Sequence, residues 1–130
     1  MLDSFFLYKK RGKRMIKDYK FELDVEGEKK QLIFNLNVMQ EIQEEYGTLE
    51  KWGELTDGKS GEVNVKALIF GLTCMINEAT DMRNEEEGLN EPMLTRKQVG
   101  RLITKAGVEK SAEKLNQAIV ESTKNEEKNA

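Results

Sequence analysis

The most apolar stretch of this charge-rich chain, residues 63–82, most constrains how the chain can fold. At 100° per residue, its apolar side chains fall within an arc of about 100°, which is typical of a helix packed against a core. These side chains are Val65, Leu68, Ile69, Leu72, Ile76 and Ala79. A smaller apolar group on the opposite side consists of Ala67, Phe70 and Cys74, interrupted by Lys66, Asn77 and Asp81. We predict a central helix that is either enclosed within its own domain or shared with a partner.

The composition excludes several kinds of catalytic and metal site. The 130 residues include no histidine and one cysteine, Cys74. The chain therefore cannot form a Ser-His-Asp triad, a Cys-His pair, a zinc site of the usual Cys/His type or an intramolecular disulfide. We predict a protein that is not an enzyme and has no metal or cofactor, and in which Cys74 packs in a core or an interface.

Length and apolar content indicate one folded domain. A chain of 130 residues has room for a single core, and 38% apolar with 35% charged residues is typical of a small soluble protein. No apolar run approaches the roughly 20 residues that span a bilayer. We therefore expect a cytoplasmic protein without a membrane partner, which also suits a free thiol.

Residues 1–14 differ from the rest of the chain. An apolar patch at residues 5–8 precedes five basic residues, the reverse of the order in a signal peptide. One interpretation is a basic arm for nucleic acid. Another is a disordered leader that is not native, with translation starting at Met15, because residues 10–13 can be encoded by a purine-rich ribosome-binding sequence. Without these five basic residues and one acidic residue, the net charge would be −7 instead of −3.

Alternation with a period of two, starting at Tyr19, predicts an antiparallel β-hairpin. One face of the first run carries Tyr19, Phe21, Leu23 and Val25, and one face of the second carries Lys30, Leu32, Phe34 and Leu36. The short loop between them contains Gly27, as hairpin loops often do. Because an isolated hairpin is marginally stable, one face of this hairpin must pack on helices.

Capping residues and glycines divide the remaining chain into helices. We predict a helix capped by Asn37 and ended by Gly47, then a short amphipathic turn in which Trp52 either covers the core or offers a stacking platform. Residues 83–91 read as a solvated acidic loop. Thr95 and Gln98 form a capping box that opens a further helix, and Gly107 separates it from the last one.

The predicted architecture is α+β, with an N-terminal antiparallel β-hairpin packed on a cluster of about four α-helices. The domain covers residues 15–123, and residues 124–130 are expected to form a disordered tail. The last helix should bury Val108, Ala112, Leu115 and Ile119.

Two apparent motifs indicate other functions less well. Residues 53–60 match the phosphate-binding pattern GxxxxGKS, but no strand precedes Gly53 and acidic residues stand where phosphates would lie. The two helices joined at residues 106–108 resemble a helix-turn-helix. The second of them carries as many acidic as basic residues, which opposes binding to phosphates. A small DNA-binding regulator remains the leading alternative function.

The order of elements, together with several short stretches, resembles the tail assembly chaperones of long-tailed phages and gene transfer agents. These stretches are Phe34-Asn35, Tyr46-Gly47 followed by Leu49, and residues 94–103, LTRKQVGRLI. The resemblance covers residues 19–123. Members of this family are often also made in a longer form by a −1 frameshift, which the possible codons for residues 123–125 and 127–129 permit.

The resemblance implies a host-cytoplasmic, non-enzymatic phage or prophage protein that acts in virion morphogenesis. Such a protein binds the tape measure protein, can also bind tail tube subunits, and keeps the tape measure soluble until the tail tube polymerises. A small acidic protein with a spare apolar face suits this role. We predict that Phe70 and Cys74, extended by Trp52, form the partner-binding face, and that self-association is possible. Another tail structural or completion protein is the third interpretation.

Overall fold

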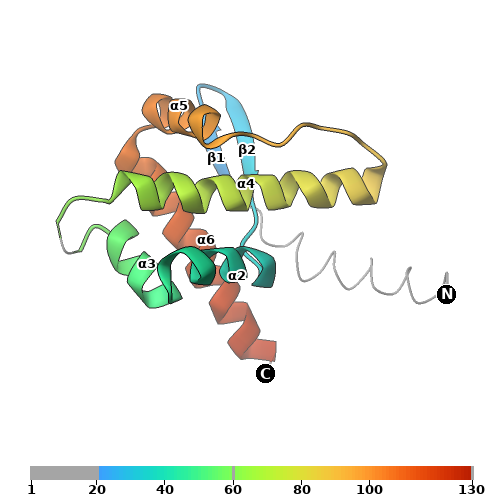
Figure 1. Ribbon diagram of the computed structural model, residues 1–130. Helices are drawn as coiled ribbons and strands as arrows, with labels where there is room; N and C mark the ends of the chain where they lie inside the picture. The colour runs from blue at the N-terminus through green and yellow to red at the C-terminus, as the bar shows by residue number, and fades with distance from the viewer. Residues whose placement is uncertain (1–20, 60, 130) are drawn as a thin grey trace.

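The computed structural model describes residues 21–59 and 61–129, which form two strands followed by five helices. The elements are β1 (Phe21–Val25), β2 (Glu28–Leu32), α2 (Leu36–Tyr46), α3 (Leu49–Thr56), α4 (Val65–Glu87), α5 (Arg96–Ala106) and α6 (Val108–Asn129). This arrangement confirms the predicted α+β architecture (Figure 1). The expectations for residues 1–14 and for a start at Met15 lie outside the described residues.

The hairpin forms as its alternation predicts. β1 pairs antiparallel with β2, so that Val25 lies opposite Glu28 and the turn consists of Glu26 and Gly27. Both turn residues have positive φ angles, 52° and 89°, and this conformation matches the twist of the flanking strands. Leu23 and Val25 are buried while Asp24 is exposed, so one face of the hairpin packs on the helices.

The second strand ends earlier than its alternation predicted. It stops at Leu32, the next two residues, Ile33 and Phe34, are both buried, and Leu36 is exposed although the pattern placed it inward. The cause is a backbone hydrogen bond from Ile33 to the Met75 carbonyl of α4, at 3.3 Å, which turns the chain away from the ladder.

α2 is capped by Asn35, not by Asn37 as predicted. The Asn35 side chain accepts a hydrogen bond from the Val38 amide at 3.2 Å. Its amide group also donates to the Glu78 carboxylate of α4 at 2.6 Å, and Asn37 donates to the same oxygen at 3.1 Å. This contact with α4, which the local sequence does not show, places the start of α2 two residues earlier.

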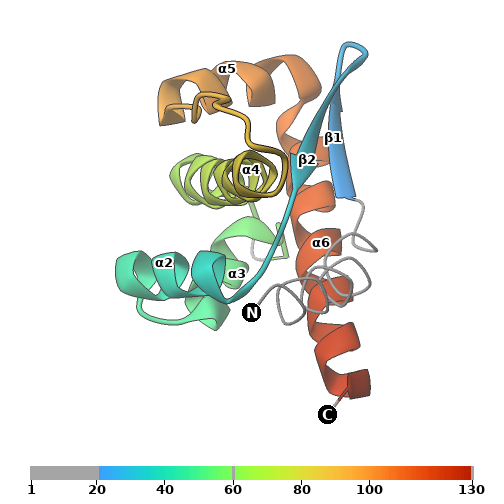
Figure 2. The ribbon, with the colours of Figure 1, turned by 90° about the vertical axis from the view of Figure 1, so that its right-hand side faces the viewer.

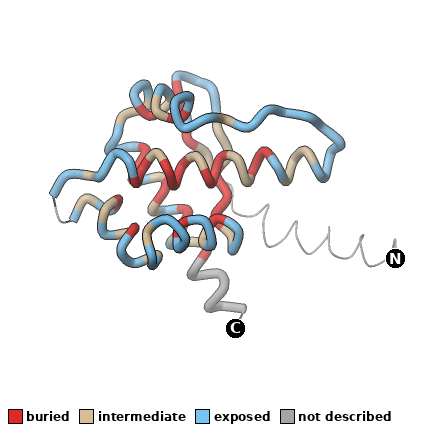
Figure 3. The backbone as a smooth tube through the Cα atoms, viewed as in Figure 1, coloured by how far each residue is buried: buried red, intermediate tan, exposed pale blue. Residues whose placement is uncertain are grey.

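α4 is the centre of the domain and packs against β2, α2, α3, α5 and α6. Seen end-on, it has α5 above it, α2 and α3 below it, and the hairpin and α6 along one side (Figure 2). Both predicted apolar sides are mostly buried (Figure 3). Of the two predicted alternatives, α4 is therefore the helix enclosed in its own domain, although Val65 is exposed and Ile69 only half-buried.

The predicted acidic loop at residues 83–91 is wrong over its first half, because α4 continues to Glu87 and ends at Gly88 with a left-handed φ of 66°. Glutamate is a good helix former, so the run at residues 85–87 prolongs the helix. Arg83 adds a side-chain contact by donating to Gln31 of β2 and to Glu91, at 3.0 Å each.

Two asparagines of α4 hold the segment that leads back to α5 (Figure 1). Asn77 donates to the Leu94 carbonyl at 2.9 Å and accepts from the Leu94 amide at 2.8 Å. Asn84, two turns further along, makes the same pair of bonds with the backbone of Glu91, at 3.1 and 3.0 Å. The two side chains thus supply backbone partners to a segment without regular secondary structure.

The last two helices largely follow the sequence. The capping box of Thr95 and Gln98 is present at the start of α5. Ala112 and Leu115 of α6 are buried as predicted, whereas Val108 is exposed. α6 runs to Asn129, through most of the stretch for which we expected a disordered tail, because its many glutamates and lysines favour helix.

Candidate partner-binding surfaces

Trp52, predicted to extend a partner-binding face, is a core residue. Its side chain is 0% exposed, and its indole Nε1 donates to the Ala67 carbonyl of α4 at 3.0 Å. The ring lies against Gly71, where even a methyl group would overlap it. Trp52 therefore covers the core and presents no surface to a partner.

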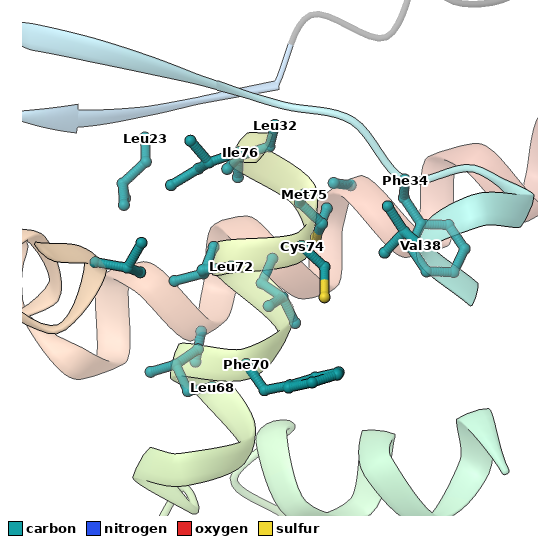
Figure 4. Packing of buried hydrophobic residues seen from close by; sticks show 14 of the residues in the cluster. Leu23, Leu32, Phe34, Val38, Leu68, Phe70, Leu72, Cys74, Met75 and Ile76 are labelled. Atoms are coloured by element: carbon teal, nitrogen blue, oxygen red, sulfur yellow. The ribbon is translucent and has the colours of Figure 1, made fainter. Parts of the chain in front are cut away.

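Phe70 and Cys74 are also largely enclosed, at 7% and 9% exposed (Figure 4). They line a groove of about 320 Å³ between α2, α4 and the segment before α5. Tyr46 packs edge-on to the Phe70 ring, with 5.6 Å between ring centroids, and the Arg96 guanidinium lies 4.9 Å from the Phe70 centroid. The structure thus brings these two predicted residues together, but Tyr46 and Arg96 of the same chain already pack against the Phe70 ring.

The environment of the Cys74 thiol disfavours the thiolate, the form that acts as a nucleophile. Burial, together with a hydrogen bond to Glu41, raises the pKa of Cys74 well above its ordinary value. Burial also raises the pKa of Tyr46. Because the thiolate is the reactive form, this environment favours the packing role predicted for Cys74.

A second, larger surface was not predicted from the sequence. Large hydrophobic side chains that remain exposed gather between the start of α4 and one face of α6: Val65 is 51% exposed, Val108 37% and Val120 60%. With Val63 and Ala112 they line a groove of about 910 Å³, which we call the valine groove. Three of the six large hydrophobic residues exposed in the described part of the chain therefore share one groove. Described residues of the α3–α4 connection, which lies on the left of Figure 1, also line it.

The rim of the valine groove is acidic. Four carboxylates line it, and Lys59 is the one cation among its described lining residues. The carboxylates belong to Asp57, Glu62, Glu109 and Glu113. The formal charge of the lining is therefore −3. The groove thus combines an apolar floor with a negatively charged rim.

Sequence reasoning missed this groove because it assigned both Val65 and Val108 to the core. One residue, Val120, could have indicated a second apolar surface. It is apolar, but it does not lie on the face that the other apolar residues of the last predicted helix share. That signal alone does not reveal which surface Val120 joins, since the meeting of α4 and α6 is a tertiary contact.

α5 and α6 form the pair that resembles a helix-turn-helix, in which the second helix, α6, would have to bind DNA. The charges of α6 do not suit this role. Between residues 111 and 120, α6 carries Glu113 and Lys114 and buries Ser111 and Leu115 against its neighbours. The basic residues lie on α5 instead, where Lys97, Arg101 and Lys105 are exposed and no acidic residue occurs. A basic face is thus present, but on the first helix of the pair.

The phosphate-binding pattern GxxxxGKS does not have the geometry of a phosphate-binding loop. Gly53, the first glycine of the phosphate-binding pattern, lies inside α3, so the pattern does not form a loop after a strand. Within residues 21–59 and 61–129, no group of three or more Cys, Asp or Glu side chains is placed to hold a metal ion. None of the helices described is both long and apolar enough to cross a bilayer.

Comparisons with protein-family models, with curated proteins and with solved structures gave no match for this chain.

Proposed function

We propose that this chain is a phage or prophage tail assembly chaperone, which binds the tape measure protein and keeps it soluble until the tail tube polymerises. The observation that carries the proposal is the valine groove, where Val65, Val108 and Val120 gather instead of being scattered over the surface. Exposed apolar side chains that share one hollow are typical of a protein–protein contact.

The groove suits a contact that must later be released. Valine side chains provide small apolar contacts, without the large aromatic anchors of the tightest interfaces. The large aromatic side chains near α4, Trp52 and Phe70, are used inside the domain. A cover of this kind shields a helical partner while leaving the tail tube subunits able to displace it.

DNA binding is the second candidate, and one observation favours it: α5 exposes Lys97, Arg101 and Lys105 without an acidic residue between them. The acidic rim of the neighbouring helix α6 works against this function, because it repels phosphates. Another tail structural or completion protein would also use an apolar groove, but would remain in the finished tail.

Co-expression with a long helical protein encoded nearby tests the proposal. We expect that protein to be insoluble alone and to elute with this chain in size-exclusion chromatography. Val120→Asp should weaken the complex because it places a charge in the groove, whereas Leu36→Asp, at an exposed apolar residue outside the groove, should leave it intact. A partner that stays insoluble beside the unmodified chain contradicts the proposal.

A further inference from the structure

The charged rim of the valine groove identifies the chemistry of the segment that the groove receives. Asp57 and Glu62 lie on the α3–α4 connection, and Glu109 and Glu113 lie one turn apart on α6. Lys30–Glu28 and Arg83–Glu91 are ion pairs of this fold, and within the described part of the chain none of the four rim carboxylates takes part in one.

Such a rim selects between partners. Carboxylates around an apolar floor repel an acidic segment and attract a basic one, and this selection is strongest where the floor excludes water. The floor itself consists of short aliphatic side chains, Val63, Val65, Val108, Ala112 and Val120, which accept apolar side chains of a helix without a specific ring or polar contact.

We propose that the valine groove receives an amphipathic helix of the partner whose apolar stripe is flanked by lysine or arginine. This inference rests on the proposed function and adds the chemistry of the segment that is bound. Apolar contact with the valines supplies the affinity, and the flanking cations lie beside Glu109 and Glu113 and fix the position of the helix along the groove.

Two other segments with both apolar and basic residues could occupy the valine groove, and the experiment below distinguishes them from a partner helix. Residues 5–14 of this chain also combine an apolar patch with five basic residues. A second copy can offer the basic face of α5, with Lys97, Arg101 and Lys105. The apolar stripe of α5 is buried in its own domain, and in residues 5–14 all the basic residues follow the apolar patch, which is why we assign the groove to a partner helix.

Binding of two designed peptides to the full chain tests the inference. Both are amphipathic helices of about 20 residues with the same leucine stripe, one flanked by lysines and the other by glutamates. Fluorescence anisotropy of the labelled peptides gives the Kd of each. We expect the lysine peptide to bind about tenfold more tightly than the glutamate peptide at low salt, and this difference to shrink as salt is added.

Charge reversal on the rim should remove this preference. The double variant Glu109→Lys/Glu113→Lys is expected to weaken the lysine peptide about tenfold. The matched control Glu44→Lys/Glu45→Lys changes the net charge equally on exposed positions of α2, outside the groove, and should stay within about twofold of the unmodified chain. Val120→Asp should weaken both peptides, because both use the apolar floor.

Four results would overturn the inference: equal binding of the two peptides, equal effects of the rim and control variants, binding only after residues 1–14 are deleted, or binding that disappears when the chain is diluted to a monomer. The first two show no selection by the rim, the third assigns the groove to the chain's own arm and the fourth to a second copy. If the long helical protein still co-elutes in any of these cases, the proposed function stands without this inference.

Discussion

At the scale of single residues, the contact between Trp52 and Gly71 decides how α3 meets α4. The indole ring fits against α4 because position 71 has no side chain, and its Nε1 donates to the Ala67 carbonyl. Both residues are buried, so neither can move toward solvent to relieve an overlap. The glycine in the middle of the central helix is therefore required by packing.

Gly71→Ala should destabilise the domain by about 1–3 kcal/mol, because the new methyl group overlaps the Trp52 ring and also lies 3.0 Å from Leu115 Cδ1. Gly53→Ala is the matched control, since a Cβ at this helical position of α3 meets nothing within 4 Å. That variant should be neutral or more stable by up to about 1 kcal/mol. Urea denaturation measures both, and an equal effect of the two changes would contradict the packing role of Gly71.

Tyr46 and Cys74 predict a loss of stability in alkaline solution. Burial raises both pKa values above the ordinary 10.0 and 9.0, so the folded protein holds these protons more tightly than the unfolded chain does. Their contribution is therefore fully present below about pH 9 and is lost as pH rises through the ordinary pKa values toward the raised ones.

Urea denaturation at about pH 7 and about pH 10.5 measures this loss. Tyr46→Phe should be close to neutral at the lower pH, because the Tyr46 hydroxyl is buried without a hydrogen-bond partner among the described residues. The same variant should lose less stability at the higher pH than the unmodified chain. An unchanged pH dependence in both Tyr46→Phe and Cys74→Ala would show that these groups do not titrate differently on folding.

At the scale of elements, local signals predicted most of the fold. The hairpin, the capping box of Thr95 and Gln98, and the glycines that end α2 and α5 follow from short sequence patterns. The differences arise where a distant element decides: Glu78 of α4 selects Asn35 as the cap of α2, and Met75 turns the chain after β2. Such contacts join residues about 40 positions apart and leave no local pattern.

The role of Asn77 also depends on a distant contact that the local sequence does not reveal. In the sequence it interrupts an apolar side of the central helix, but in the structure it makes two hydrogen bonds with the Leu94 backbone. Asn77→Ala should destabilise the domain by about 1–2 kcal/mol, because both Leu94 groups lose their partner.

This loss should be accompanied by faster amide hydrogen exchange at Leu94. Gln40→Ala is a suitable control, since the exposed Gln40 side chain bonds to Glu44 within its own helix and to no other side chain in residues 21–59 and 61–129. It should change stability by less than about 0.5 kcal/mol. Unchanged exchange at Leu94 in the Asn77 variant would mean that the asparagine does not hold this segment.

At the scale of the whole molecule, the exposed apolar surface does not lie where the sequence predicted it. The two-sided apolar pattern of α4 predicted a spare face, but α2, α3 and α5 cover both sides, and Phe70 and Cys74 keep only a narrow opening. Three exposed valines, Val65, Val108 and Val120, gather instead at the start of α4 and along α6. A periodic pattern shows that a helix has an apolar side, whereas only the tertiary arrangement shows which element covers it.

The measurement that tests the central claim most directly is amide hydrogen exchange of this chain, free and in complex with the long helical protein encoded nearby. We predict slower exchange on binding in residues 57–59, 61–65 and 108–120, which contain the lining of the valine groove and its rim, and little change around Phe70. Protection confined to α5, or to the groove that Phe70 and Cys74 line, would contradict this account.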